Sequence, residues 1–175
     1  TFQNIRLFPN MTALENVMVG RYCRTSAGAL TPILRGPKFR REEEETRTRA
    51  VELLEYVGMK GQGSHLARNL PYGDQRRLEI ARALATDPKL LLLDEPTAGM
   101  NPQETRQAEE LIFKIRDSGL TIVVIEHNLD LIKCADYIFD IGPEGGSGGG
   151  ELVAKGTPEE VANTAKSHTG KYLKK

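Results

Sequence analysis

Several features that mark particular classes of protein are scarce or missing in this sequence. No apolar stretch approaches the roughly 18 residues that a membrane-spanning helix needs, so no transmembrane segment is predicted. Cys23 and Cys134 lie far apart and form no Cys-x-x-Cys pair, which argues against a disulfide framework and a zinc site. Basic and acidic residues number 24 each. The overall charge therefore indicates neither nucleic acid nor an acidic membrane surface as a partner.

The chain is long enough for one hydrophobic core and a small subdomain. It begins at Thr1 rather than at methionine, and no signal peptide is visible. We expect this start to be a cut into a longer protein.

Hydrophobic periodicity predicts mainly helices before residue 88 and alternating strands and helices after it. Capping patterns predict that helices begin at Thr12, Asn101, Asn128 and Thr157. Other helices are expected over residues 38–57 and 72–85, and strands are expected to start at Leu90 and to cover 120–125, 137–141 and 151–155. The last two strands are expected to form a hairpin across the glycine-rich segment 142–150. The fold class is therefore α/β, with a helical segment ahead of a sheet segment.

The most informative segment is Leu90-Leu-Leu-Leu-Asp-Glu-Pro96. Four consecutive leucines are typical of a strand that is buried on both faces. Two adjacent carboxylates at its end indicate that the strand opens into a polar site, where ligands bind in open α/β sheets. Asp94 could hold a magnesium ion and Glu95 could orient an attacking water, two roles that phosphoryl transfer requires. The alternative is a core strand that ends in a solvated turn.

Four other segments are weak signals when each is taken alone. Gly73, within the segment Leu70 to Gln75, stands at the start of a helix, where backbone N–H groups and the helix dipole favour an anion. A loop at residues 98–102 follows the carboxylates and could reach a partner subunit. His127 follows a second strand, where a lone histidine is more often structural. Gln3 could contact water or a metal.

Together and in this order, these segments resemble the motifs of the ATP-binding-cassette (ABC) ATPases. Gln3 matches the Q-loop, and residues 70–75 match the signature motif. Residues 90–95 match the Walker B motif with its catalytic glutamate, residues 98–101 the D-loop, and His127 the switch histidine. The signature departs from the commonest Leu-Ser-Gly-Gly-Gln form, and the departing residues are Pro71, Tyr72 and Asp74.

The resemblance implies a partial P-loop NTPase fold, in which a helical subdomain is followed by a mainly parallel sheet with flanking helices. It divides the chain into a Q-loop segment (1–9), a helical subdomain with the signature motif (10–85) and the carboxyl-terminal part of the ATPase core (86–175). It also implies a head-to-tail dimer with a second ABC ATPase subunit, and contact with membrane permease subunits through the helical subdomain.

ATP and Mg²⁺ are the cofactors that the resemblance implies. Glu95 is then the general base, and His127 contacts the γ-phosphate. Asp94 coordinates magnesium through water, and Gln3 senses the metal and the attacking water. The residues implied to contact the nucleotide are Gln3, Tyr72, Gly73, Asp74, Gln75 and Asn101.

A finer resemblance divides the chain near His127. Residues 1–127 look like the ATPase subunits of branched-chain amino-acid importers, whereas residues 128–175 look like the carboxyl end of the UvrA excision-repair ATPases. A chimera of two cassette fragments and a natural transporter subunit with an unusual tail both remain open. The zinc-binding cysteine pairs of the repair enzymes are missing, and the basic tail is more typical of a solvated end than of a DNA site.

The phosphate loop Gly-x-x-x-x-Gly-Lys-Ser/Thr occurs nowhere in the printed sequence. Electrostatic positioning of the phosphates is most of what phosphoryl transfer requires, so we expect these 175 residues alone to be inactive.

Three functional hypotheses follow. The first is the ATPase subunit of an ABC importer for branched-chain amino acids, expected in the cytoplasm and peripheral at the inner face of the cell membrane. The second is a UvrA-like DNA-repair ATPase, and the third is a non-catalytic folding module built from cassette pieces. The transported substrate is not encoded here, because substrate choice lies in other subunits.

Overall fold

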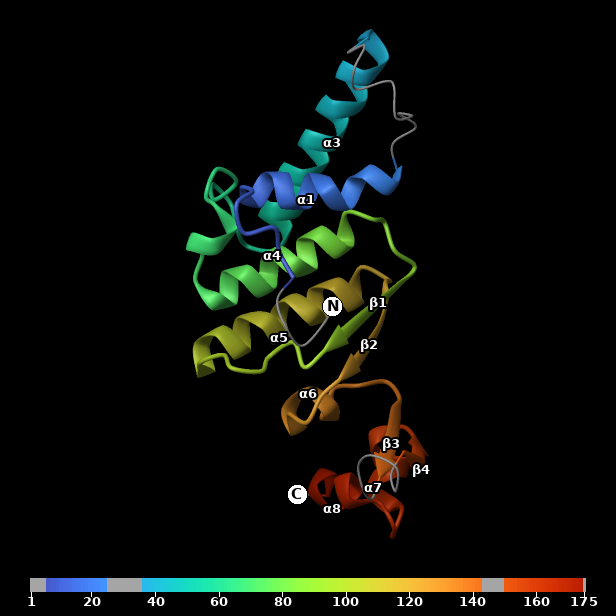
Figure 1. Ribbon diagram of the computed structural model, residues 1–175. Helices are drawn as coiled ribbons and strands as arrows, with labels where there is room; N and C mark the ends of the chain where they lie inside the picture. Colours follow the sequence, from blue (N-terminus) through green and yellow to red (C-terminus); the bar gives the residue numbers. More distant parts are fainter. Residues whose placement is uncertain (1–5, 25–35, 143–149, 175) are drawn as a thin grey trace. The chain divides into compact units, whose positions relative to one another are not determined.

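The structure is a computed structural model that describes residues 6–24, 36–142 and 150–174. Contacts divide the chain into two compact units, Thr1–Ile125 and Glu126–Lys175 (Figure 1). In the part of the chain that is described, no helix combines the length and the apolar character that crossing a membrane requires.

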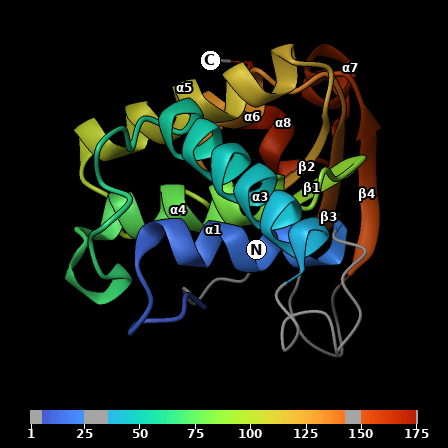
Figure 2. The ribbon, with the colours of Figure 1, turned by 90° about the horizontal axis from the view of Figure 1, so that it is seen from above.

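The described residues of the first unit form four α-helices, two short 3-10 helices and a pair of strands. In chain order its elements are α1 (Ala13–Arg21), η1 (Tyr22–Arg24), α3 (Pro37–Tyr56), η2 (Ala67–Asn69), α4 (Tyr72–Leu84), β1 (Leu90–Asp94), α5 (Pro102–Asp117) and β2 (Thr121–Ile125). Helix α3 crosses α1 and α4 (Figures 1 and 2). The predicted capping boxes at Thr12 and Asn101 are both present, and they set where α1 and α5 begin.

Helices α1 and α4 pack closely at Gly20. A Cβ at this position would collide with the backbone oxygen of Arg82, so the absence of a side chain permits the contact. Asn16 on α1 is fully buried, and its amide nitrogen donates to the oxygens of Phe8 (3.1 Å) and Thr12 (3.0 Å). Its Oδ1 accepts from the Phe8 N–H at 2.9 Å. These bonds fix the segment that follows the predicted Q-loop. Gln3 itself lies outside the described residues.

The strands β1 and β2 are adjacent and parallel, in agreement with the mainly parallel sheet that the family resemblance implies, with Leu91 opposite Ile122 and Asp94 opposite Ile125. The prediction that the leucine run is buried on both faces is wrong. Leu91 and Leu93 are 3% and 2% exposed, whereas Leu90 and Leu92 are 47% and 55% exposed. Successive side chains of a strand point to opposite faces, and within the described part of the first unit the face of Leu91 and Leu93 is covered while that of Leu90 and Leu92 is exposed.

The second unit consists of α6 (Leu129–Lys133), β3 (Ile138–Gly142), β4 (Glu151–Gly156), α7 (Pro158–Asn163) and α8 (His168–Leu173). Strands β3 and β4 pair antiparallel, which confirms the predicted hairpin pairing. Most of its glycine-rich turn, residues 143–149, lies outside the described residues. Ile138, Ala154 and Val161 form the small core of the unit.

The sequence predicted one terminal helix, but the structure has two. Thr164 is extended and ends α7, and the side chain of Ser167 accepts from the Gly170 N–H and caps α8. The Ser167 and Thr169 hydroxyls both donate to the Asp140 carboxylate, at 2.5 and 2.9 Å, which ties α8 to β3.

Candidate functional site

Parallel pairing places the carboxyl ends of β1 and β2 at the same edge of the sheet. The Glu95 N–H, just beyond β1, donates to the Ile125 oxygen at 2.9 Å, so the pairing continues to the point where the carboxylates begin. Glu126 and His127 follow directly on Ile125 but belong to the second unit. There the Glu126 carboxylate accepts from the N–H groups of His127 (2.8 Å) and Asn128 (3.0 Å).

Glu95 has a left-handed backbone conformation, with φ of 43°. This region is strained for a residue with a side chain, and such residues concentrate at functional sites. The loop after Glu95 is tight: the Ala98 N–H donates to the Glu95 oxygen at 3.1 Å, and Gly99 has φ of 75°. The backbone therefore turns sharply at the residue that the sequence identifies as the general base.

The predicted signature residues form the start of α4. Pro71 is the N-cap and makes no side-chain cap, so it leaves the first N–H groups of the helix available to an anion. Asp74 pairs with Arg77 one turn later. The side-chain amide of Gln75 donates to the Leu70 oxygen at 2.8 Å, which stabilises the loop.

The side chain of Glu104 lies beside Gly73 and also binds Asn101. A Cβ at Gly73 would lie 3.0–3.1 Å from the Glu104 side chain. Glu104 in turn accepts from the Asn101 N–H at 3.0 Å, as part of the capping box of α5. The structure therefore places the predicted signature and D-loop segments side by side.

Sequence reasoning missed a buried ion pair on α4. The Arg76 and Glu79 side chains are 5% and 4% exposed, and Arg76 Nη1 lies 3.4 Å from Glu79 Oε2. Glu79 Oε1 also accepts from the Arg6 N–H at 3.1 Å. Opposite charges three residues apart in a helix with buried apolar neighbours were the signal that could have identified the pair.

The described residues fit part of a magnesium and nucleotide site. No group of three or more His, Cys, Asp or Glu side chains in the described ranges could hold a metal by itself. Magnesium needs only one or two protein carboxylates when phosphate oxygens and water complete its shell, and Asp94, half-buried at the end of β1, suits that role.

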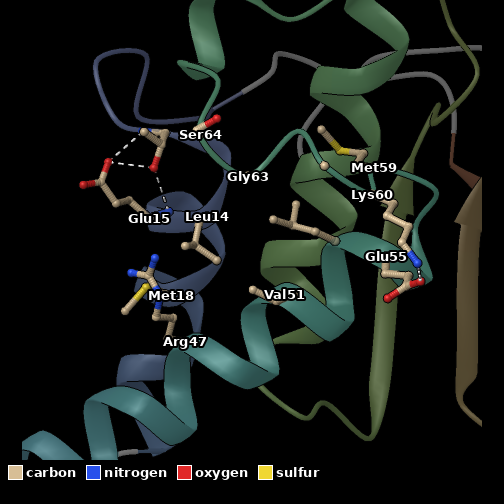
Figure 3. A pocket seen from close by; sticks show the side chains of 13 residues that line it. Leu14, Glu15, Met18, Arg47, Val51, Glu55, Met59, Lys60, Gly63 and Ser64 are labelled. Carbon is tan, nitrogen blue, oxygen red and sulfur yellow. Dashed lines mark hydrogen bonds and ion pairs between the residues drawn. The ribbon is translucent and has the colours of Figure 1, made fainter.

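A pocket of about 540 Å³ lies on the helical part of the first unit. Its apolar lining includes Leu14 and Met18 from α1 and Val51 from α3. Figure 3 shows Glu15 on one side of the pocket and the pair of Glu55 and Lys60 on the other.

The charges around this pocket are held by local bonds. The Thr12 N–H and hydroxyl donate to Glu15 and lower the pKa of that carboxyl below its usual 4.5. The hydrogen bond to Glu55 raises the pKa of Lys60. An apolar floor with a charged rim suits contact with an amphipathic segment of another protein.

Curated relatives include two ATP-binding proteins of high-affinity branched-chain amino-acid transport. LivG of Salmonella typhimurium is 42% identical over 165 residues, and BraF of Pseudomonas aeruginosa is 41% identical over 163 residues. These matches cover 93% and 92% of this chain and 62% of each relative. The chain thus spans less than two thirds of the length of these relatives.

The UvrABC system protein A of Aquifex aeolicus is 47% identical over 134 residues, covering 73% of this chain and 14% of the relative. The LivG match covers 93% of the chain and so extends across His127. These matches do not confirm a junction between two parent proteins there.

Solved structures show the same fold. A dimeric, post-hydrolysis structure of the ATP-binding cassette MJ0796, bound to ADP and Pi, gives a TM-score of 0.63 at 29% identity, covering 79% of this chain and 55% of that one. The cbiO1 protein of Clostridium perfringens, part of the ABC transporter complex cbiONQ, gives a TM-score of 0.67 at 25% identity, covering 89% and 54%. The family model described as ABC transporter matches residues 1–98. The chain belongs to the ABC transporter family.

Proposed function

We propose that the complete gene product containing these residues is the ATP-hydrolysing subunit of an ABC importer for branched-chain amino acids, acting in the cytoplasm at the inner face of the cell membrane. The observation that carries this proposal is the similarity to LivG and BraF, which extends over more than nine tenths of the chain. The carboxylates at the end of β1, beside a parallel neighbour, support it from the structure.

The chain's own residues then have distinct tasks. Bound Mg²⁺ would neutralise phosphate charge, and Asp94 would hold it through water. Glu95, at the left-handed turn after β1, accepts the proton of the attacking water. Backbone N–H groups at Gly73 donate to a phosphate bound by the partner subunit of a head-to-tail dimer. From the family resemblance we also propose that His127 contacts the γ-phosphate and that Gln3 senses the metal.

The pocket between α1 and α3 is where we place the contact with the permease. Val51 is half exposed at the pocket, although it is apolar. Val51→Asp should therefore weaken co-purification with the permease without unfolding the protein. Thr48→Asp is the matched control, because Thr48 lies exposed on the same helix and does not line the pocket.

Phosphate release is the direct test of the proposed activity. The complete gene product should hydrolyse ATP, and Glu95→Gln should abolish turnover. We expect the 175 residues alone to bind Mg-ATP weakly in calorimetry and to release phosphate no faster than background. Turnover by the 175 residues that Glu95→Gln abolishes would require a phosphate site that the sequence does not reveal.

A DNA-repair ATPase is the second candidate, favoured by the 47% identity to the UvrABC system protein A. Binding of damaged DNA, with no association to a permease pair, would favour it. Loss of both activities with cooperative folding intact would instead favour the non-catalytic folding module.

A further inference from the structure

The hydroxyl of Tyr72 joins two segments that lie 26 residues apart in sequence. It donates to the Ala98 oxygen at 3.2 Å, in the loop after β1. It also accepts from Nη2 and Nε of Arg76, at 2.9 and 3.2 Å. Tyr72 is one of the residues at which this signature departs from the commonest form, so the contact belongs to this variant of the motif.

Gly99, in the loop after β1, lies beside the ring of Tyr72. Gly99 has φ of 75°, and a Cβ built there would lie 3.7–3.8 Å from atoms of the Tyr72 ring and from its hydroxyl oxygen. The next residue of α4, Gly73, lies against Glu104, which holds the Asn101 N–H. Two consecutive residues of α4 therefore contact the segment 98–104 near both of its ends.

Arg76 is fixed from its other side. Its buried partner Glu79 accepts from the Arg6 N–H, so a continuous series of polar contacts runs from Arg6 through Glu79, Arg76 and Tyr72 to Ala98. Arg76 and Glu79 are almost fully buried, so the middle of this series has little access to water and is held in one geometry, while the Tyr72 end is exposed.

We propose that Tyr72 is a positioning residue, which locks the loop at residues 98–101 to the start of α4 so that both present one rigid surface to the partner subunit. The proposal rests on the ATPase dimer proposed above, because both segments act there. Tyr72 itself need not touch the nucleotide. It acts through the Ala98 carbonyl, and loss of its hydroxyl frees the loop while leaving Gly73 in place.

Tyr72→Phe in the complete gene product is the test, because it removes the hydroxyl and keeps the ring against Gly99. Hydrogen exchange of the Ala98 and Met100 amides should speed up about fivefold, the factor that one lost hydrogen bond provides. The kcat for ATP hydrolysis should fall by a similar factor, while KM for ATP changes less than twofold.

Tyr56→Phe is the matched control, because the Tyr56 hydroxyl donates to the Lys114 oxygen at 3.1 Å outside this series of contacts. It should alter neither the exchange of the loop nor kcat. Should Tyr72→Phe fail to fold, Gly99→Ala strains the same loop through its backbone, because φ of 75° disfavours a side chain, and should act in the same direction.

The proposal is overturned if Tyr72→Phe and Tyr56→Phe give the same kcat, or if loop exchange is unchanged in Tyr72→Phe. A wild-type protein without ATP turnover would instead remove the proposed function. A normal wild-type rate with an unaffected Tyr72→Phe rate would overturn the positioning role alone.

Discussion

Replacing Glu79 by glutamine should destabilise the protein strongly. Exposed ion pairs three residues apart on a helix contribute little, but this pair is buried. The substitution is isosteric, and the amide oxygen can still accept from the Arg6 N–H. It leaves the Arg76 guanidinium, whose side chain is only 5% exposed, without its 3.4 Å counter-charge. Arg76 keeps its other contacts, among them the hydroxyl of Tyr72, which is neutral.

The expected cost follows from that burial. Removing one partner of a buried ion pair costs about 3–5 kcal/mol, since the remaining charge loses its counter-charge at a site with little access to water. The contacts that Arg76 keeps put Glu79→Gln near the lower end, at about 3 kcal/mol. Replacing both partners, as Arg76→Met with Glu79→Leu, leaves no unpaired charge and should cost about 1 kcal/mol.

Urea unfolding followed by far-ultraviolet circular dichroism measures these differences, and Arg76→Met, Glu79→Leu and their combination form a double-mutant cycle. Glu45→Gln is the control, because Glu45 pairs with Arg41 at 3.0 Å while both side chains are largely exposed. That change should cost less than about 0.5 kcal/mol. A loss for Glu79→Gln as small as the control's, or a double mutant whose loss equals the sum of the single ones, would refute the reasoning.

Two further predictions concern α1. Gly20→Ala should cost about 1–3 kcal/mol in urea unfolding, because the new methyl group meets the Arg82 backbone oxygen, whereas Gly63→Ala, which meets side-chain atoms at ordinary distances of 3.6–3.7 Å, should be nearly neutral. The hydrogen bonds from Thr12 depress the pKa of Glu15, so their contribution to stability is complete above pH 4.5 and is lost as pH falls through the lowered value. Glu15→Gln should therefore be less stable than wild type by under about 1 kcal/mol at neutral pH and equal to it in strong acid; a gap that persists in acid contradicts this assignment.

Helix starts were predictable from the sequence because their determinants are local. Thr12 with Glu15 and Asn101 with Glu104 each satisfy the first N–H groups of a helix within four residues of chain. The parallel neighbours β1 and β2 were predictable from the order of motifs that the family resemblance supplied.

Other features depend on what lies across the fold, and no local pattern encodes them. Four leucines in a row predicted burial of both strand faces, yet which face is covered depends on elements that pack there, and Leu92 is exposed. The hydrogen bond between Tyr72 and Ala98 forms only where two segments 26 residues apart meet. Nothing in the sequence around Gly99 indicates that Tyr72 lies beside it. The placement of Gln3 and the roles of His127 stay predictions.

The conformation of Glu95 has a consequence for any attempt to improve this protein. A side chain in the left-handed region costs about 1–3 kcal/mol, which glycine would largely recover. A screen that ranks variants by melting temperature alone would therefore favour Glu95→Gly and discard the carboxylate on which hydrolysis is proposed to depend. Thermal stability and ATP turnover therefore place opposite demands on residue 95. Glu95→Gln keeps the backbone strain and removes the charge, so it shows the effect on turnover without the gain in stability.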